Sequence, residues 1–291
     1  MKITQMATYR SLQYNLGKNS DSLNKLYEQA ATGKQLERAS DDPSGLSPLF
    51  SSRTQIETSD RYLETIATTQ DNLDIVDGYL DSAESLLVRA KEIAIYGVND
   101  SLSDEDMQTL AAEVVQLQSA LLDIANAKVD SKYIFAGYAE TTLPFSGDPV
   151  VYNGTDDHKL VETSAGQTVQ TNLTGNEVFM EPVDMFAVLS DLEAALSSAD
   201  GDAVEAELDN LEAVAEQVRS KQSEMGNINS HLDDVSSLTE NIKLQMQERL
   251  SSYEDADIVA VMTGITQAEQ AYEAALSVSA RVSSLSILDY L

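Results

Sequence analysis

The chain has 291 residues, with 49 Asp or Glu against 18 Lys or Arg, so its net charge is -31. Such an acidic chain lacks the basic surface that binds nucleic-acid phosphates or anionic lipid, and neither is expected as a partner. The absence of Cys excludes disulfides and thiolate catalysis. No apolar run approaches the roughly 20 residues of a membrane span. The first residues, Met1 to Met6, lack the apolar core of a secretory signal, so no cleaved signal is expected.

The first predicted helix runs from Leu16 to about Gly33. Its apolar residues Leu16, Leu23 and Leu26 have a heptad-like spacing, and Gly33 can end the helix in a left-handed conformation. The segment 39–45 that follows has turn chemistry. Its pair Asp41-Asp42, directly ahead of Pro43, is interpreted as a cap or turn rather than as two catalytic carboxylates.

A long helix is predicted from about Pro48 to Tyr96. One apolar residue recurs every seven positions over four heptads, and a companion position is filled by Val76, Ala83 and Ala90. This repeat is typical of a coiled coil. A shorter helix, ending near Asp130, is predicted after a Ser103–Asp106 capping box. The sevenfold repeat of the long helix consists of Ile66, Leu73, Leu80, Leu87 and Ala94.

Composition changes between about residues 133 and 182, where Phe, Pro, Thr, Val and Gly become frequent. Short runs at 149–152 and 167–171 alternate with Gly and Asn turns and predict a small β-rich insertion. A helix returns near Pro182, a turn at 199–202 follows, and a second long helix is predicted for about 203–251. The last helix begins near Ile258 and carries apolar residues at two heptad positions.

These elements predict a mainly α fold: a long antiparallel coiled-coil or helical-bundle rod with a small β-rich insertion domain. The simplest path folds the chain back on itself at the insertion, so that the first and last helices lie side by side. Three domains are expected. Residues 1–44 with 255–291 form a terminal coiled-coil domain for assembly, 45–138 with 183–254 form a helical domain, and 139–182 form an outward β-rich domain.

Three motifs resemble a known family. Ala31-Thr32-Gly33-Lys34 followed by 39–45 resembles the N-terminal signature of the flagellin superfamily, and 252–257 leading to 270–276 resembles its C-terminal counterpart. The segment 132–138 with 141–145 is similar to a segment of the hook–filament junction family within that superfamily, as is the ending 284–291. Residues 146–180 match no motif of that family.

The resemblance implies a structural subunit of the bacterial flagellum that joins hook to filament. It also implies neighbouring axial proteins and copies of itself as partners, an export chaperone, and export through the flagellar type III apparatus to the cell exterior. Flagellin itself, a bulk filament subunit, is the alternative within the family. An intracellular coiled-coil adaptor is an alternative of another class, and an enzyme is the class that the sequence favours least.

No residue pattern predicts a catalytic, cofactor or metal site. The histidines His158 and His231 are far apart in sequence and form no metal-ligand spacing. Asp200-Gly201-Asp202 lacks the remaining ligands of a calcium loop, and the glycines form no phosphate-binding pattern. No cofactor is therefore expected.

The terminal helices carry the predicted interface. A short isolated helix pair is marginal in water, so we expect folding of the ends to be coupled to their packing against neighbouring subunits. Contacts of this heterologous kind generate helical arrays. The predicted assembly residues are Leu16, Leu23, Leu26, Ile258, Val261, Ile265, Tyr272, Val282 and Leu285.

Overall fold

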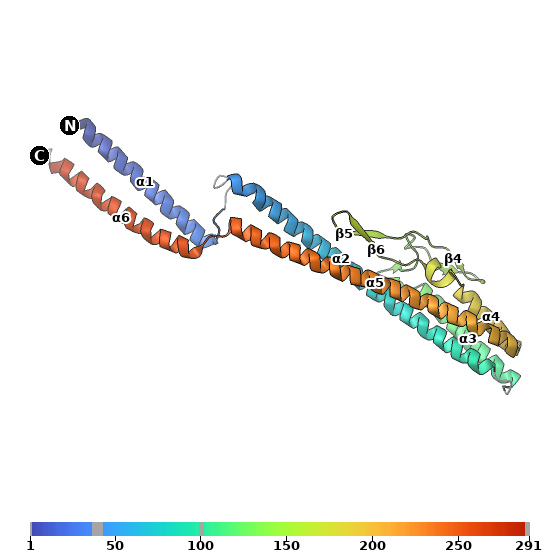
Figure 1. The fold of residues 1–291 in the computed structure, drawn as a ribbon. Helices are drawn as coiled ribbons and strands as arrows, with labels where there is room; N and C mark the ends of the chain where they lie inside the picture. Colours follow the sequence, from blue (N-terminus) through green and yellow to red (C-terminus); the bar gives the residue numbers. More distant parts are fainter. Residues whose placement is uncertain (1, 37–42, 99–101, 289–291) are drawn as a thin grey trace. The chain divides into compact units, whose positions relative to one another are not determined.

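The computed structural model describes residues 2–36, 43–98 and 102–288, apart from the side chains of 2–6, 8, 44 and 282–288. Within these ranges the chain is mainly α-helical, with long helices and small antiparallel strand pairs, as the sequence predicts (Figure 1). The helices are α1 (Lys2–Thr32), α2 (Pro43–Gly97), α3 (Asp104–Ala125), α4 (Met185–Ser197), α5 (Gly201–Glu254), α6 (Ile258–Leu288) and the short π-helix η1 (Asn176–Met180).

The chain divides into two compact units. Residues 1–58 and 242–291 form one, called the terminal unit below, and residues 59–241 form the other, called the central unit. Helices α2 and α5 contribute a segment to each. No described helix is long and apolar enough to cross a membrane.

Helices α2 and α5 run antiparallel through the central unit. Gln70 bonds to Asp233, Glu84 pairs with Arg219 and Lys91 pairs with Glu212, so the partner's number falls as the number on α2 rises. The predicted heptad residues of α2 are all buried. The coiled-coil periodicity therefore identified the buried face of α2 correctly, because only one stripe of a long helix can face its partner. The buried residues on α5 that belong to the same core include Leu211, Val214, Val218, Leu232 and Val235.

Helix α3 begins as predicted and ends earlier than predicted. Ser103 accepts a hydrogen bond from the Asp106 N–H, and the Asp106 carboxylate accepts one from the Ser103 N–H, which completes the capping box. The predicted end near Asp130 is wrong. The helix ends at Ala125 because a hairpin starts at Lys128, with Asp130 and Ser131 at its turn in left-handed conformations of φ 49° and 67°.

Between α3 and η1 the described chain forms three separate two-stranded antiparallel hairpins rather than a single sheet, and the first of them precedes the predicted insertion 139–182. The first pairs β1 (Lys128–Val129) with β2 (Lys132–Tyr133), and the second pairs β3 (Phe145–Ser146) with β4 (Val151–Tyr152). The third pairs β5 (Leu160–Ser164) with β6 (Gln167–Gln170). Hairpins this small are marginal alone, so their stability depends on the core beneath them.

That core is aromatic. The rings of Phe135 and Phe179 meet edge to face with centroids 5.1 Å apart, and those of Phe145 and Phe179 do so at 5.5 Å; all three side chains are fully buried. The Asn126 amide, just after α3, donates to the Phe145 carbonyl and accepts from its N–H. The junction-type segments 132–138 and 141–145 therefore serve packing within the central unit.

Two other helix starts differ from the sequence prediction. Helix α2 begins at Pro43 rather than Pro48, because proline fits the first helical turn, where the N–H would have no helical partner. Helix α1 begins at Lys2 rather than Leu16. Residues 2–15 were missed because apolar residues at heptad spacing are sparse there. Residues 41–42, predicted to cap the helix, lie outside the described residues.

Candidate assembly surface

Helices α1 and α6 pack side by side along their length in the terminal unit (Figure 1). The partly buried positions on each helix alternate at spacings of three and four residues, as in a two-helix coiled coil. Val261 and Ile265 are the best covered, at 7% and 8% exposed. These contact positions are Leu12, Leu16, Asn19, Leu23, Leu26 and Ala30 on α1, and Val261, Ile265, Ala268, Tyr272, Ala275 and Ser279 on α6.

Six of the nine predicted assembly residues thus lie in the contact between the chain's own terminal helices. Ile258 does not, because it lies in the first turn of α6 and is 48% exposed. The side chains of Val282 and Leu285 lie outside the described residues. The contact of the pair is incompletely covered, since Leu16, Leu23 and Leu26 are only partly buried.

The outward faces of the pair carry large apolar side chains. Tyr14 is 72% exposed on α1 and Val259 is 76% exposed on α6. Scattered exposed apolar residues are ordinary, but here several lie on two helices that also have little buried core of their own. Apart from Ile258, the exposed residues of these two helices were not among the predicted assembly residues, because that prediction followed the heptad positions. The Tyr27 hydroxyl, by contrast, donates to the Glu269 carboxylate on α6, so this exposed ring borders the contact. The other exposed members are Tyr9, Ile258, Met262, Leu276 and Val278.

A buried carboxylate lies at the base of this helix pair. Glu254, the last residue of α5, is 5% exposed. Its carboxylate forms ion pairs with Lys34 at 2.5 Å and with Arg53 at 2.8 Å. Burial would raise the pKa of Glu254, but the hydrogen bonds and charges of Lys34 and Arg53 outweigh it and hold the pKa below its usual value. One charged group therefore ties together the segment after α1, the start of α2 and the end of α5.

Backbone bonds reinforce this joint. The Gln35 N–H donates to the Glu254 carbonyl at 2.7 Å, and the Ala256 N–H donates to the Gly33 carbonyl at 2.8 Å. Gly33 has φ +72°, the left-handed conformation in which a glycine commonly ends a helix. The Asp257 side chain accepts from the N–H groups of Val259 and Ala260 and caps α6.

The joint brings together two of the sequence motifs. Ala31–Lys34 and Ser252–Asp257 are far apart in the chain, and they meet through the Lys34–Glu254 pair and the Lys34–Asp255 bridge. The residues of 39–45 that complete the N-terminal motif are mostly outside the described ranges. Both motifs are visible in the sequence, but nothing there indicates that they meet, because a contact across so long a separation leaves no local pattern.

The candidate chemical residues form no site of their own. His158 lies 3.6 Å from the Glu177 carboxylate, and His231 is exposed on α5. Asp200 accepts from the Ala203 N–H at the start of α5, which makes it a helix cap. Among the described residues, no group of three His, Cys, Asp or Glu is placed to hold a metal ion.

Comparison with known proteins agrees with this architecture. Residues 3–140 match the family model of the bacterial flagellin N-terminal helical region. This match spans a little under half of the chain and confirms that its motifs resemble those of the flagellin superfamily.

Particular members are similar to different extents. Flagellar hook-associated protein 3 of Escherichia coli is 28% identical over 181 residues, 62% of this chain and 57% of that protein. The match therefore spans little more than half of that relative. The flagellin of Listeria monocytogenes is 28% identical over 127 residues, 43% of this chain and 44% of that one. The solved hook-associated protein 3 of Legionella pneumophila shares the fold, with a TM-score of 0.63 and 17% identity over 69% of this chain and 98% of that one.

Proposed function

We propose that this chain is a structural subunit of the bacterial flagellum that joins hook to filament, and that it catalyses no reaction. The observation that carries the proposal is the α1–α6 pair, whose contact is only partly covered and whose outward faces expose large apolar residues. Such a surface is completed by packing against other molecules. The similarity to hook-associated protein 3, at 28% identity over 181 residues, supports the junction role. A flagellin of Halalkalibacterium halodurans matches a longer stretch of 257 residues, but at the lower identity of 23%.

The proposed partners are copies of this chain and the flanking axial proteins, including flagellin. The outward residues of α1 and α6 would contact neighbouring subunits, while the predicted assembly residues of the inner contact would hold the two helices together for that purpose. Because neighbours at a junction differ on its two sides, the contacts would be heterologous and would propagate along a helix. Export through the flagellar type III apparatus with a chaperone, and a place outside the cell, belong to the same proposal.

Deleting the gene tests the proposal. Cells without this protein should keep their hooks, lose their filaments and release flagellin into the medium. The reason is that flagellin would have no junction subunits to bind at the end of the hook. Electron microscopy of the hooks and an immunoblot of the medium measure both effects. The result expected of bulk flagellin is different: bare hooks without released monomer. That outcome would favour the alternative.

Labelling gives an independent test. The chain has no Cys, so a single cysteine placed at exposed Gln247 or Gln55 can carry a fluorophore without competing reactions. The junction role predicts one short band between hook and filament. Label along the whole filament would contradict it, as would label confined to the cell interior.

A further inference from the structure

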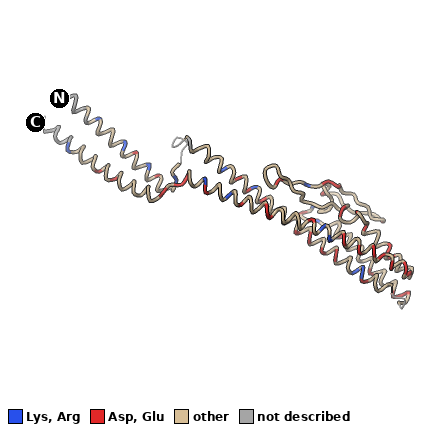
Figure 2. The backbone as a smooth tube through the Cα atoms, viewed as in Figure 1, with Lys and Arg blue, Asp and Glu red and all other residues tan. Residues whose placement is uncertain are grey.

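Acidic residues are distributed unequally between the two units. Residues 59–241 hold 36 of the 49 Asp and Glu residues but only 8 of the 18 Lys and Arg residues, so the central unit has a net charge of -28. The terminal unit holds the remaining 13 acidic and 10 basic residues, for a net charge of -3. Figure 2 shows the acidic positions crowded along α3, α4 and the adjoining parts of α2 and α5.

Ion pairs within the central unit are already formed. At least six of its eight basic side chains contact a carboxylate, and Lys128 lies over the Tyr133 ring at 4.2 Å. Arg219 by itself pairs with three glutamates. The remaining carboxylates therefore have too few basic side chains within the unit to pair with. The six paired side chains are Arg89, Lys91, Lys132, Lys159, Arg219 and Lys221.

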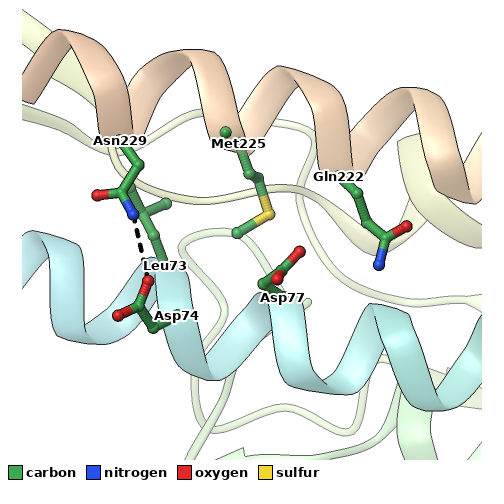
Figure 3. A pocket seen from close by; sticks show the side chains of 7 residues that line it. Leu73, Asp74, Asp77, Gln222, Met225 and Asn229 are labelled. Carbon is green, nitrogen blue, oxygen red and sulfur yellow. Dashed lines mark hydrogen bonds between the residues drawn. The ribbon is translucent and has the colours of Figure 1, made fainter.

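Like charges lie close together on the part of α2 that faces α5. A hollow of about 130 Å³ there is lined by Asp74 and Asp77, and the Asn229 amide donates to Asp74 at 3.2 Å (Figure 3). Burial, with the charges of Asp81 and Asp74, raises the pKa of Asp77. Carboxylates in this region thus repel one another without a Lys or Arg among the residues that line the hollow.

We propose that the folded central unit is stabilised by cations drawn from solution, so that its stability rises with ionic strength while that of the terminal unit changes little. A large net charge destabilises a compact state through self-repulsion. Mobile cations screen that repulsion, because the Debye length falls from about 30 Å at 0.01 M salt to about 3 Å at 1 M. No single site is needed; the ligand is the cation atmosphere of the whole surface.

The inference concerns the monomer and does not depend on the proposed function. Where copies pack as proposed above, the same charge opposes their approach, and screening would favour assembly as well. Failure of assembly at every salt concentration would count against the function, whereas the monomer measurement below decides the inference alone.

Charge-changing variants of the full-length chain provide the test. Asp71, Asp81, Asp209 and Asp234 are exposed on α2 and α5. One variant replaces all four by Lys, and its matched control replaces the same four by Glu, which keeps the charge. Both residues are good helix formers, so helix propensity is matched.

The thermal unfolding midpoint is measured by circular dichroism at monomeric concentration in NaCl from about 0.01 M to about 1 M. Hydrogen exchange of α2 and α5 amides within 59–241 assigns the transition to the central unit. The unchanged chain and the Glu variant should gain at least about 2–4 °C with salt. The Lys variant should start higher and gain clearly less.

Two results would overturn the proposal. An unfolding midpoint of the unchanged chain that does not rise with salt would show that self-repulsion is unimportant. An equal rise in the Lys and Glu variants would show that salt acts on apolar surface in general and not through these charges.

Discussion

Glu254 shows how one side chain can organise three segments of a mostly helical chain. A buried carboxylate is costly unless it is paired. Here two cations pair with it, Lys34 from the segment after α1 and Arg53 from α2. Both cations are nearly half exposed, at 46% and 44%. Solvent therefore screens the pairs, and their net stabilisation is smaller than that of fully buried ones.

We predict that Glu254→Gln weakens the joint by about 1 kcal/mol. The Gln35 and Ala256 amides, whose bonds cross the joint, should then exchange hydrogen about fivefold faster. Native-state hydrogen exchange measures this directly. Glu248→Gln, at an exposed position of the same helix, should leave both rates unchanged. Equal rates in all three proteins would mean that the backbone bonds suffice without the charge.

The joint should also weaken in acid. The pKa of Glu254 is lower in the folded chain than its unfolded value of about 4.3. The stabilisation is therefore complete above that unfolded value and is lost as the pH falls through the folded one. Exchange at Gln35 and Ala256, corrected for its intrinsic pH dependence, should accelerate over this window. Glu254→Gln should abolish that acceleration, and its persistence in the variant would point to another group.

Position 137 in the central unit accepts only glycine without strain. It has φ +64°, and a Cβ there would lie 2.1 Å from the Thr155 carbonyl oxygen. Gly137→Ala should destabilise the unit by more than about 2 kcal/mol. Gly166, at φ +74° with open space around it, is the control, and its Ala variant should lose only about 1 kcal/mol from backbone strain. Chemical denaturation compares the two variants, and equal losses would contradict the steric argument.

At the scale of elements, α6 has two faces that differ in burial. Ile265 faces α1 and is buried, whereas Val259 and Met262 are more than half exposed. A helix in a stable two-helix pair would normally carry polar residues on its outer face. The outer apolar residues Val259 and Met262 therefore bury little of their surface in the described fold of the monomer.

Substitutions can separate these faces. Val259→Lys with Met262→Lys should leave the helicity of the monomer unchanged but fail to restore filaments in the deletion strain, because a charge would be buried between subunits. Ile265→Lys should lower the helicity of the monomer itself by breaking the α1–α6 contact. Circular dichroism and filament counts report the two effects. Normal filaments with the double variant would exclude this face from assembly.

The buried face of α2 was predictable because the heptad spacing of apolar residues marks the buried stripe of a long helix. Leu73, Leu80 and Leu87 could therefore be assigned to that stripe from the sequence alone. Helix ends were harder, since α1 extends through residues with few apolar heptad positions. Ile258 fits the heptad of α6 but is exposed, because a repeat does not show where the partner helix ends. The Lys34–Glu254 joint was beyond sequence reasoning, as ion pairs across long separations leave no local pattern.

At the scale of the whole molecule, the two units differ in how much core they hold. The central unit contains one continuous cluster of buried apolar residues, including three fully buried Phe. In the α1–α6 pair, the buried apolar residues among those described are Val261 and Ile265. Regions with little buried apolar surface open locally at low free energy.

We predict that amides of α1 and α6 exchange hydrogen at least about a hundredfold faster than those of α2 and α5 at positions 66–94 and 211–235 in the isolated monomer. A gap of about 3 kcal/mol in opening free energy corresponds to that ratio. The same amides should become slow in assembled flagella. Strong protection of α1 and α6 in dilute monomer would show that the ends are already stable, against the expectation of coupled folding and packing.

The joint has a consequence for the order in which the chain can mature. Arg53 and Glu254 are 201 positions apart, so a ribosome delivers Arg53 long before the carboxylate with which it pairs. Until then the opening helix has no α6 to lie against, and the basic side chains near it await their carboxylate. Translation therefore supplies α1 long before the α6 helix against which it packs.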